Sequence, residues 1–138
     1  MTGLIWFVQI VHYPLFAQVG ENGFSVYSRQ HARRTGWVVA PLMLSELGTA
    51  LLFLFSAFRP AFLPISAAIA GLFLLAVIWL STALLQVPLH NRLVQGFDPS
   101  AAQKLVTGNW LRTVCWTLRA LLLLWYLRSA LSLGLILW

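Results

Sequence analysis

The chain has 138 residues, of which 60% are hydrophobic and only 9% are charged. A soluble domain has about 25% charged residues, so this composition excludes an ordinary soluble domain and predicts an integral membrane protein. The formal net charge of +6 at pH 7 is not accompanied by a basic stripe or a stacking platform, which argues against a nucleic-acid partner. The single cysteine, Cys115, cannot form an internal disulfide and lies among apolar neighbours.

The first apolar segment runs from about Leu4 to Val19 and predicts a short membrane span. Its length by helical rise is about 24 Å, against a hydrocarbon core of about 30 Å. Pro14 lies inside the segment and predicts a kink that frees a backbone carbonyl near Ile10. No positive residue precedes the segment, which is therefore not typical of a cleaved signal peptide.

A polar connection follows from Gly20 to Gly36, in which Phe24, Tyr27, His31 and Arg34 recur at helical spacing. We interpret this connection as a short helix lying at the membrane surface. In one alternative it is an interfacial anchor whose arginines contact lipid phosphates. In the other alternative, His31 and Arg34 are turned inward over the helical bundle.

Three further apolar spans follow this connection. The second runs from Trp37 to about Phe58 and contains one acid, Glu46, before a turn at Arg59 and Pro60. We predict an all-α fold, an integral membrane four-helix bundle that forms a single transmembrane domain over residues 1–138. The expected spans are at about 2–20, 37–58, 62–90 and 109–137, with a short interfacial helix in each of the two cytoplasmic connections.

The second polar connection lies within the stretch from Gln86 to Arg119. The chain leaves the third apolar span through Pro88 and His90. Asp98 is then followed by Pro99, a pattern typical of a helix start with aspartate as the N-cap and proline at the first helical position.

The distribution of basic residues predicts the orientation of the chain in the membrane. One predicted side carries only Arg59 and Arg128, the latter near the C-terminal end. The positive-inside rule then places the two long connections in the cytoplasm and both termini outside, in a cell (inner) membrane. The basic residues of those connections are Arg29, Arg33, Arg34, Arg92, Lys104 and Arg112.

A weak internal repeat relates the two halves of the chain. An offset of 78 positions aligns His12 with His90 and Arg34 with Arg112, and it places H-x-x-R-T over N-x-x-R-T. Chance would explain so few identities, but they also fit a fold of two parallel helix-pair repeats.

Ionisable groups inside a bilayer are costly, so their depth carries information. By helical rise, Glu46, Arg119 and His12 lie about 12–14 Å from the cytoplasmic ends of their spans, and His90 is shallower. We therefore expect a polar pocket in the cytoplasmic half of the bundle. Glu46 and Arg119 are the expected charge pair, either as a structural bridge between two spans or as part of the pocket.

Arg112, Trp116 and Arg119 follow i, i+4, i+7 spacing, which puts both guanidinium groups on one helix face. Two inward-facing arginines would suit an anionic or phenolate-like ligand, because the guanidinium fork binds oxyanions. In the alternative, Arg112 only snorkels to the lipid headgroups.

His12 and His90 allow more than one kind of chemistry. Together with Glu46 they would supply two imidazoles and a carboxylate, a set that suits iron, copper or zinc. A neutral imidazole would equally serve as a general base, or it would only form a hydrogen bond between helices. The cofactor stays open between one of these metals and none. Motifs for nucleotide binding and for triad hydrolysis are missing from the sequence.

The motif V-P-L-H-N-R-L at 87–93, followed by N-W-x-R-T-x-x-W at 109–116, resembles the anthrone oxygenase-like family of small four-span membrane proteins. The resemblance implies a four-helix fold and, in the characterised branch, oxygenation of polycyclic phenolic substrates without an obvious cofactor. It extends to Asn109 and Arg112 and to the segment 88–91. The first half of the chain departs from the family pattern.

The favoured hypothesis is a membrane oxidoreductase of oxygenase type acting on a small lipophilic or phenolic substrate. His12 or His90 would take the substrate proton, the two arginines would stabilise the oxyanion, and Glu46 would orient an arginine or a histidine. The catalytic residues would be His12, Glu46, His90, Arg112 and Arg119. The residues expected to contact substrate are Tyr13, Tyr27, His31, Arg34, Gln86, Asn109 and Trp116.

Two other functions are consistent with the sequence. One is a non-catalytic membrane subunit that binds a metal, haem or a chlorophyll-type pigment through histidines. The other is a small transporter in which the intramembrane acid and histidines relay protons. The expected partners are the lipid bilayer, a small lipophilic substrate, and either a second copy of the chain or a membrane-complex partner.

Overall fold

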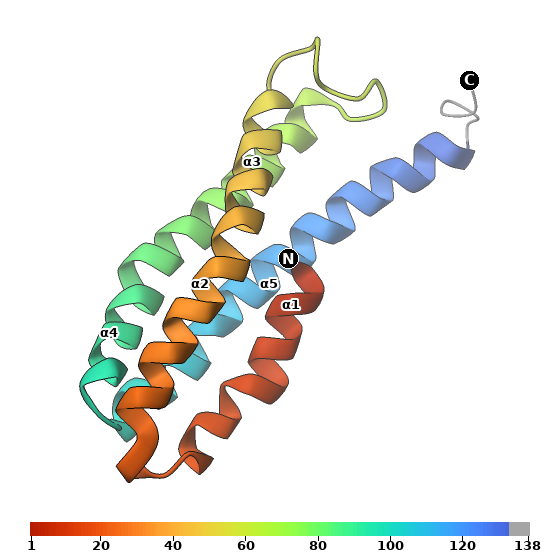
Figure 1. Ribbon diagram of the computed structural model, residues 1–138. Helices are drawn as coiled ribbons and strands as arrows, with labels where there is room; N and C mark the ends of the chain where they lie inside the picture. Colours follow the sequence, from red (N-terminus) through yellow and green to blue (C-terminus); the bar gives the residue numbers. More distant parts are fainter. Residues whose placement is uncertain (133–138) are drawn as a thin grey trace.

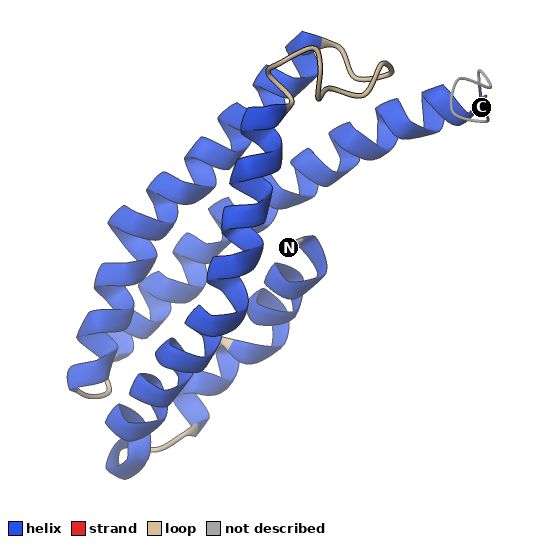
Figure 2. Cartoon of the chain, turned by 45° about the horizontal axis from the view of Figure 1, so that its top comes forward, coloured by secondary structure: helices blue, strands red, loops and turns tan. Residues whose placement is uncertain are grey.

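The computed structural model describes residues 1–132, and within this range the chain is helical apart from turns and has no strand (Figure 2). The α-helices are α1 (Thr2–Phe7), α2 (Glu21–Leu52), α3 (Ile65–Ser81), α4 (Val87–Gln95) and α5 (Pro99–Ser132). Two π-helical turns, Val8–His12 and Thr82–Gln86, and one 3-10 turn, Pro14–Gln18, lie between them. The all-α prediction is confirmed.

Three helical segments are long and apolar enough to cross a membrane, which makes this a membrane protein. They are α2, the continuous segment Ile65–Gln95 that joins α3 to α4, and α5. The first apolar helix, Thr2–Phe16, is shorter than these three. Many large apolar side chains point outward, as in Trp37, which is 77% exposed, and lipid is their natural environment.

The expected surface helix at residues 20–36 does not exist as a separate element. It is the first half of α2, which continues from Glu21 to Leu52 as one helix of 32 residues, about 48 Å long by helical rise. The helix ends before the predicted Phe58, and residues 53–64 form turns. There the guanidinium of Arg59 donates to the carbonyls of Phe53 and Leu54 at 3.3 and 3.4 Å, which satisfies groups left free at the helix end.

Gly20 makes the sharp turn between the first helical segment and α2. Its φ of +77° lies in the left-handed region, where a side chain is disfavoured. The turn reverses the chain direction, so the first segment lies antiparallel to the first half of α2 (Figure 1).

The predicted start of the last helix is confirmed. Oδ1 of Asp98 accepts a hydrogen bond from the backbone N–H of Ala101 at 3.1 Å, and Pro99 is the first residue of α5. The second interfacial helix is not separate either, because α5 runs without a break from Pro99 to Ser132. Arg92 at the end of α4 contacts Oδ2 of Asp98 at 2.6 Å and holds the connection closed.

The helices pack around a stripe on α5 that points into the bundle. Ala101, Leu105, Asn109, Arg112 and Trp116 are all buried and recur every three or four residues. Nearer the C-terminus, Leu122 and Tyr126 pack against Ala67 and Ala68 at the start of α3. The last turns of α5 then extend away from the other helices (Figure 1).

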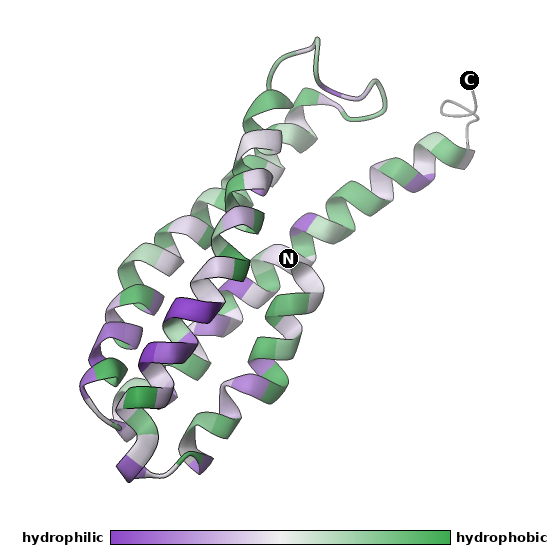
Figure 3. Cartoon of the chain, viewed as in Figure 1, coloured by the Kyte–Doolittle hydropathy of each residue, from purple (hydrophilic) through white to green (hydrophobic). Residues whose placement is uncertain are grey.

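The Gly20 turn and the α4–α5 connection lie at the same end of the bundle (Figure 1). Hydrophilic residues are concentrated toward this end of α2 and α4 (Figure 3). The polar groups of the candidate site belong to this part of the molecule.

Candidate functional site

Three histidines and a tyrosine gather between the first helical segment, α2 and α4. Nε2 of His12 lies 2.8 Å from Nδ1 of His31, and their rings stack with centroids 4.5 Å apart. Nε2 of His90 lies 3.1 Å from the hydroxyl of Tyr13, and the His90 and His31 rings are 5.5 Å apart. We call His12, Tyr13, His31 and His90 the imidazole cluster.

Two irregular turns position this cluster. His12 ends the π-helical turn Val8–His12, which is followed by the proline turn at Pro14. The second π-helical turn, Thr82–Gln86, precedes Pro88 in the same way. Proline cannot donate to the carbonyl four residues before it, so the helix widens locally and turns different side chains inward. Gln86, at the end of the second turn, is only 1% exposed.

The imidazole cluster borders a cavity of about 230 Å³ that lies between α2, α4 and α5. We call it the Arg112 cavity. Ligand pockets usually measure about 300–1,000 Å³, so this cavity suits a small ligand. Its polar lining consists of Tyr13, His31, Thr35, Thr82, Gln86, His90, Asn91 and Arg112.

Arg112 is the charged group of this cavity. Its side chain is 7% exposed, and its Nη1 donates to the hydroxyl of Thr82 at 3.4 Å. Its guanidinium also lies over the ring of Trp116, 5.4 Å from the ring centroid. Across residues 1–132, no carboxylate lies within ion-pair distance of Arg112, and its Nε has no hydrogen-bond partner. A buried cation without a counter-ion is costly, so this arrangement favours an anionic ligand.

A layer of buried amides lies beside Arg112. Nδ2 of Asn109 donates to Oε1 of Gln9 at 2.8 Å, and Nε2 of Gln9 donates to the carbonyl of Val106 at 3.2 Å. Both side-chain polar atoms of Gln86 lack a hydrogen-bond partner in the part of the chain that the structure describes. Because Gln86 lines the Arg112 cavity, its amide is available to a bound ligand.

Glu46 and Arg119 form the predicted charge pair, with Arg119 Nη1 3.5 Å from Glu46 Oε1. The other oxygen, Oε2, accepts a hydrogen bond from the indole N–H of Trp116 at 2.8 Å. This pair is separate from the imidazole cluster, because His12 contacts His31, fifteen residues before Glu46 on α2. That separation corresponds to about 22 Å of helical rise, so the expected common depth of His12 and Glu46 is not observed.

The difference in depth has a simple cause. We predicted depths from Trp37 as the start of the second span, but α2 begins at Glu21. Two antiparallel segments joined at Gly20 bring together residues that lie at similar distances from the turn. His12, before the turn, therefore contacts His31, after the turn. Glu46 therefore lies beside Arg119 and not beside the histidines.

The structure also does not bring together His12, Glu46 and His90, the three residues considered as metal ligands. Within residues 1–132, no group of three or more histidine, cysteine, aspartate or glutamate side chains is arranged to hold a metal ion. His12 and His31 instead use facing ring nitrogens in a hydrogen bond with each other.

Of the seven expected substrate contacts, Tyr13, His31 and Gln86 line the Arg112 cavity, and four do not: Tyr27, Arg34, Asn109 and Trp116. The Tyr27 ring stacks on His31 with centroids 6.2 Å apart, and Arg34 is exposed. Arg34 lines a second cavity of about 260 Å³ between the first helical segment and α2. We call this the Arg34 cavity; His12 and His31 also line it, among apolar residues such as Phe7 and Val38.

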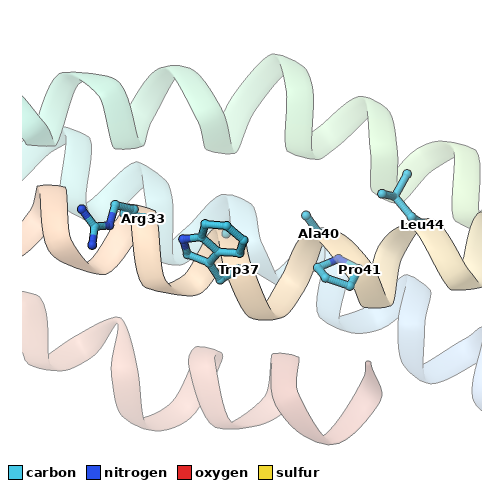
Figure 4. Close-up of a pocket in the computed structure, with 6 residues that line it drawn as sticks. Arg33, Trp37, Ala40, Pro41 and Leu44 are labelled. Atoms are coloured by element: carbon cyan, nitrogen blue, oxygen red, sulfur yellow. The ribbon is translucent and has the colours of Figure 1, made fainter.

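A third hollow, of about 330 Å³, lies on the outer side of α2 and is lined only by residues of that helix (Figure 4). Arg33, Trp37 and Leu44 are among its residues. A hollow lined by one helix encloses no ligand, and its apolar surface suits lipid chains.

Sequence reasoning missed three residues that organise the site. Gln9 holds Asn109, Thr82 accepts from Arg112, and the hydroxyl of Thr35 lies 3.2 Å from Nδ1 of His31. A glutamine in an apolar span is itself a signal that Gln9 is functional or paired. Threonine is common in membrane helices, so the other two carried no such signal.

Comparison of the chain with protein-family models, curated proteins and solved structures finds no match.

Proposed function

We propose that this chain is a membrane oxidoreductase of oxygenase type that binds a small phenolic substrate as its phenolate in the Arg112 cavity. The observation that carries the proposal is a buried arginine without a carboxylate partner among the described residues, facing the same cavity as two imidazoles. An ionised phenol would supply the missing negative charge, and its apolar ring would suit a site reached from the bilayer.

His90 is the general base in this proposal. When its Nε2–H donates to the Tyr13 hydroxyl, 3.1 Å away, the lone pair of Nδ1 is free to accept a proton. Nδ1 is buried and has no hydrogen-bond partner among residues 1–132. The substrate O–H bond breaks, the proton passes to His90, and the oxyanion pairs with Arg112.

Ionisation makes the conjugated ring system electron-rich, which prepares it for oxidation by dioxygen. For a polycyclic phenol with an activated methylene group, the balanced reaction converts one methylene group and one dioxygen into one ketone carbonyl and one water. Both C–H bonds of the methylene carbon break, and a carbon–oxygen double bond forms. The carbon gives up four electrons, which reduce dioxygen; one oxygen atom stays on carbon and the other leaves as water with the two hydrogens.

We further propose that the first segment is a fourth span, so that the chain forms a four-helix bundle. It is supported by contacts along α5: the Trp6 indole N–H donates to the Thr117 hydroxyl at 3.0 Å, and the Thr2 hydroxyl donates to the Trp116 carbonyl at 3.3 Å. The basic end of the bundle, with the Gly20 turn, would face the cytoplasm of an inner membrane, and both termini would lie outside.

Binding of para-nitrophenolate to detergent-purified protein tests the anion site. Arg112→Met should weaken binding about 10- to 100-fold, the range expected for a lost charge-assisted hydrogen bond. Arg33→Met is the matched control, because Arg33 lies on the outer side of α2. Equal affinity of the Arg112→Met variant and the wild-type protein would refute the site.

An oxygen electrode with anthrone as the probe tests the reaction. Wild-type protein should consume one dioxygen per anthrone oxidised, and His90→Ala should lose this activity while staying monodisperse and helical. Dioxygen consumption no faster than in a detergent blank would contradict the oxygenase proposal. An absorbance band of haem or pigment in the purified protein would instead support a non-catalytic subunit.

A further inference from the structure

The Arg112 cavity and the Arg34 cavity lie on opposite sides of one stripe of α2. His31, Thr35 and Val39 line both cavities, at positions i, i+4 and i+8 of the helix. His90 and Arg112 line only the first cavity, and His12 and Arg34 line only the second. His31 is thus a titratable side chain that reaches both spaces.

A direct hydrogen bond crosses this wall. Nδ1 of His31 faces Nε2 of His12 at 2.8 Å, and the Thr35 hydroxyl lies 3.2 Å from the same Nδ1. In a hydrogen bond between two neutral imidazoles one ring donates and the other accepts. If the donating ring gains a proton on its other nitrogen and the accepting ring loses one from its other nitrogen, transfer of the shared proton leaves both rings neutral with changed tautomers. The pair therefore connects the two cavities by a single proton transfer.

The charges around the pair disfavour a proton resting there. The titratable groups facing it are Tyr13 from the first segment, Tyr27 and Arg34 from α2, His90 from α4 and Arg112 from α5. No carboxylate lines either cavity within the described residues, and Glu46 is paired with Arg119 elsewhere. An added positive charge meets only other cations and dipoles, so the pair suits transfer rather than storage.

We propose that His31 and His12 form a proton relay that connects the Arg112 cavity to the Arg34 cavity. The inference rests on the proposed phenolate site. The proton that His90 takes from substrate passes through cavity water to Nε2 of His31. The Nδ1–H of His31 is donated to Nε2 of His12, and the Nδ1–H of His12 is released to water beside Arg34. One water occupies about 30 Å³, a small part of the about 230 Å³ of this cavity, so a bridging water can share the cavity with a small phenolate.

The relay runs in both directions over one turnover. It removes a proton when the phenol ionises, and it returns one when dioxygen is reduced to water. No electrons pass through it, and the overall reaction releases no net proton. Neither histidine needs to contact substrate, so their role is separable from binding at Arg112.

Stopped-flow mixing with para-nitrophenol separates the two roles, because its ionised form absorbs visible light. The final amplitude reports phenolate bound at Arg112, and the rate reports removal of its proton. His12→Ala, outside the Arg112 cavity, should keep the amplitude of the wild-type protein but lower the rate on the order of 100-fold, and His31→Ala should lower the rate to the same extent. Added imidazole should restore much of the rate, and Arg33→Gln should change neither quantity.

The outcomes distinguish the two proposals. If Arg112→Met does not reduce the amplitude, the phenolate site fails and the relay fails with it. If the amplitude depends on Arg112 but both histidine variants ionise the probe at the wild-type rate, only the relay is overturned. A slow rate that imidazole does not restore shows a structural role for the histidines and also overturns the relay.

Discussion

The amide of Gln86 lies against Gly108 on α5, so closely that a Cβ atom at position 108 would meet Gln86 Nε2 at 3.3 Å. This close approach places the buried Gln86 amide at the wall of the Arg112 cavity. Among residues 1–132, the amide has no hydrogen-bond partner. A side chain larger than hydrogen at position 108 would therefore crowd the Gln86 amide at this wall of the site.

We predict that a branched side chain at this position displaces Gln86. Gly108→Val should weaken para-nitrophenolate binding about 10-fold, because it forces the amide away from the ligand or into its space. Gly108→Ala should be milder, since the end of a glutamine side chain moves easily by a few tenths of an ångström. Gly48→Val is the control, because nothing lies within 4 Å of a Cβ built there. Unchanged affinity in Gly108→Val would show that Gln86 does not contact the ligand.

The ion pair between Glu46 and Arg119 should stabilise the bundle. Their side chains are 21% and 12% exposed, so breaking the pair should cost less than the about 3–5 kcal/mol of a fully buried pair. Glu46→Gln and Arg119→Met should each destabilise the protein by about 2 kcal/mol, and the double variant should be milder than their sum. Equilibrium unfolding in mixed detergent measures the cycle. Additive losses would mean that the ion pair has no energetic coupling.

Replacing the buried arginine of the site should have the opposite effect on stability. Arg112→Met removes an uncompensated buried cation and keeps an apolar chain of similar length, so the protein should be as stable as wild type or more stable by about 1 kcal/mol. The same unfolding assay measures this difference in the ligand-free protein. A loss of several kcal/mol would show that Arg112 is part of the structural framework, as Arg119 is.

The α4–α5 connection should weaken in acid. The hydrogen bond from the Ala101 backbone N–H, together with the charge of Arg92, lowers the pKa of Asp98 below its usual value. A carboxyl group with a lowered folded-state pKa contributes stability above its unfolded pKa, and this contribution is lost as the pH falls through the folded pKa. Asp98→Asn should be less stable than wild type at neutral pH, and the difference should shrink in acid. A constant difference across this range would rule out Asp98 ionisation as the cause.

Site-directed labelling tests the orientation of the chain. Cys115 is buried, and replacing it with alanine provides a cysteine-free background. Cysteines at Gln30 and Ser100, both exposed, should react with a membrane-impermeant reagent only from the cytoplasmic side. Ser56, in the exposed turns after α2, should react only from the outside when replaced by cysteine. Labelling of positions 30 and 100 from opposite sides would refute the four-span topology.

Several features could be predicted because they depend on local chemistry or on bulk composition. An apolar chain with few charges indicates a membrane protein, and an Asp-Pro step after a polar connection indicates the start of a helix. A single intramembrane acid is expected to pair with a nearby arginine. The structure agrees on the Asp98 cap and on the Glu46–Arg119 pair, and it has three membrane-length helices where four spans were predicted. The internal repeat stays a prediction.

The partners of the histidines depended on where α2 begins, and local patterns do not determine this. A polar helical stretch next to an apolar span is compatible with a surface helix and with an extension of the span. Packing against the first segment makes it an extension of the span. His12 therefore contacts His31 and does not lie at the level of Glu46.

The sequence by itself determined the membrane class, the helical architecture and the set of polar side chains that must find partners. These follow from the cost of moving charges and backbone groups out of water, which does not depend on the fold. Only the tertiary structure decided which partners they find. In the structure Glu46 pairs with Arg119, whereas Arg112 faces a cavity that has no carboxylate among the described residues. The reason is that the rotation and register of packed helices are set by contacts between residues far apart in the chain.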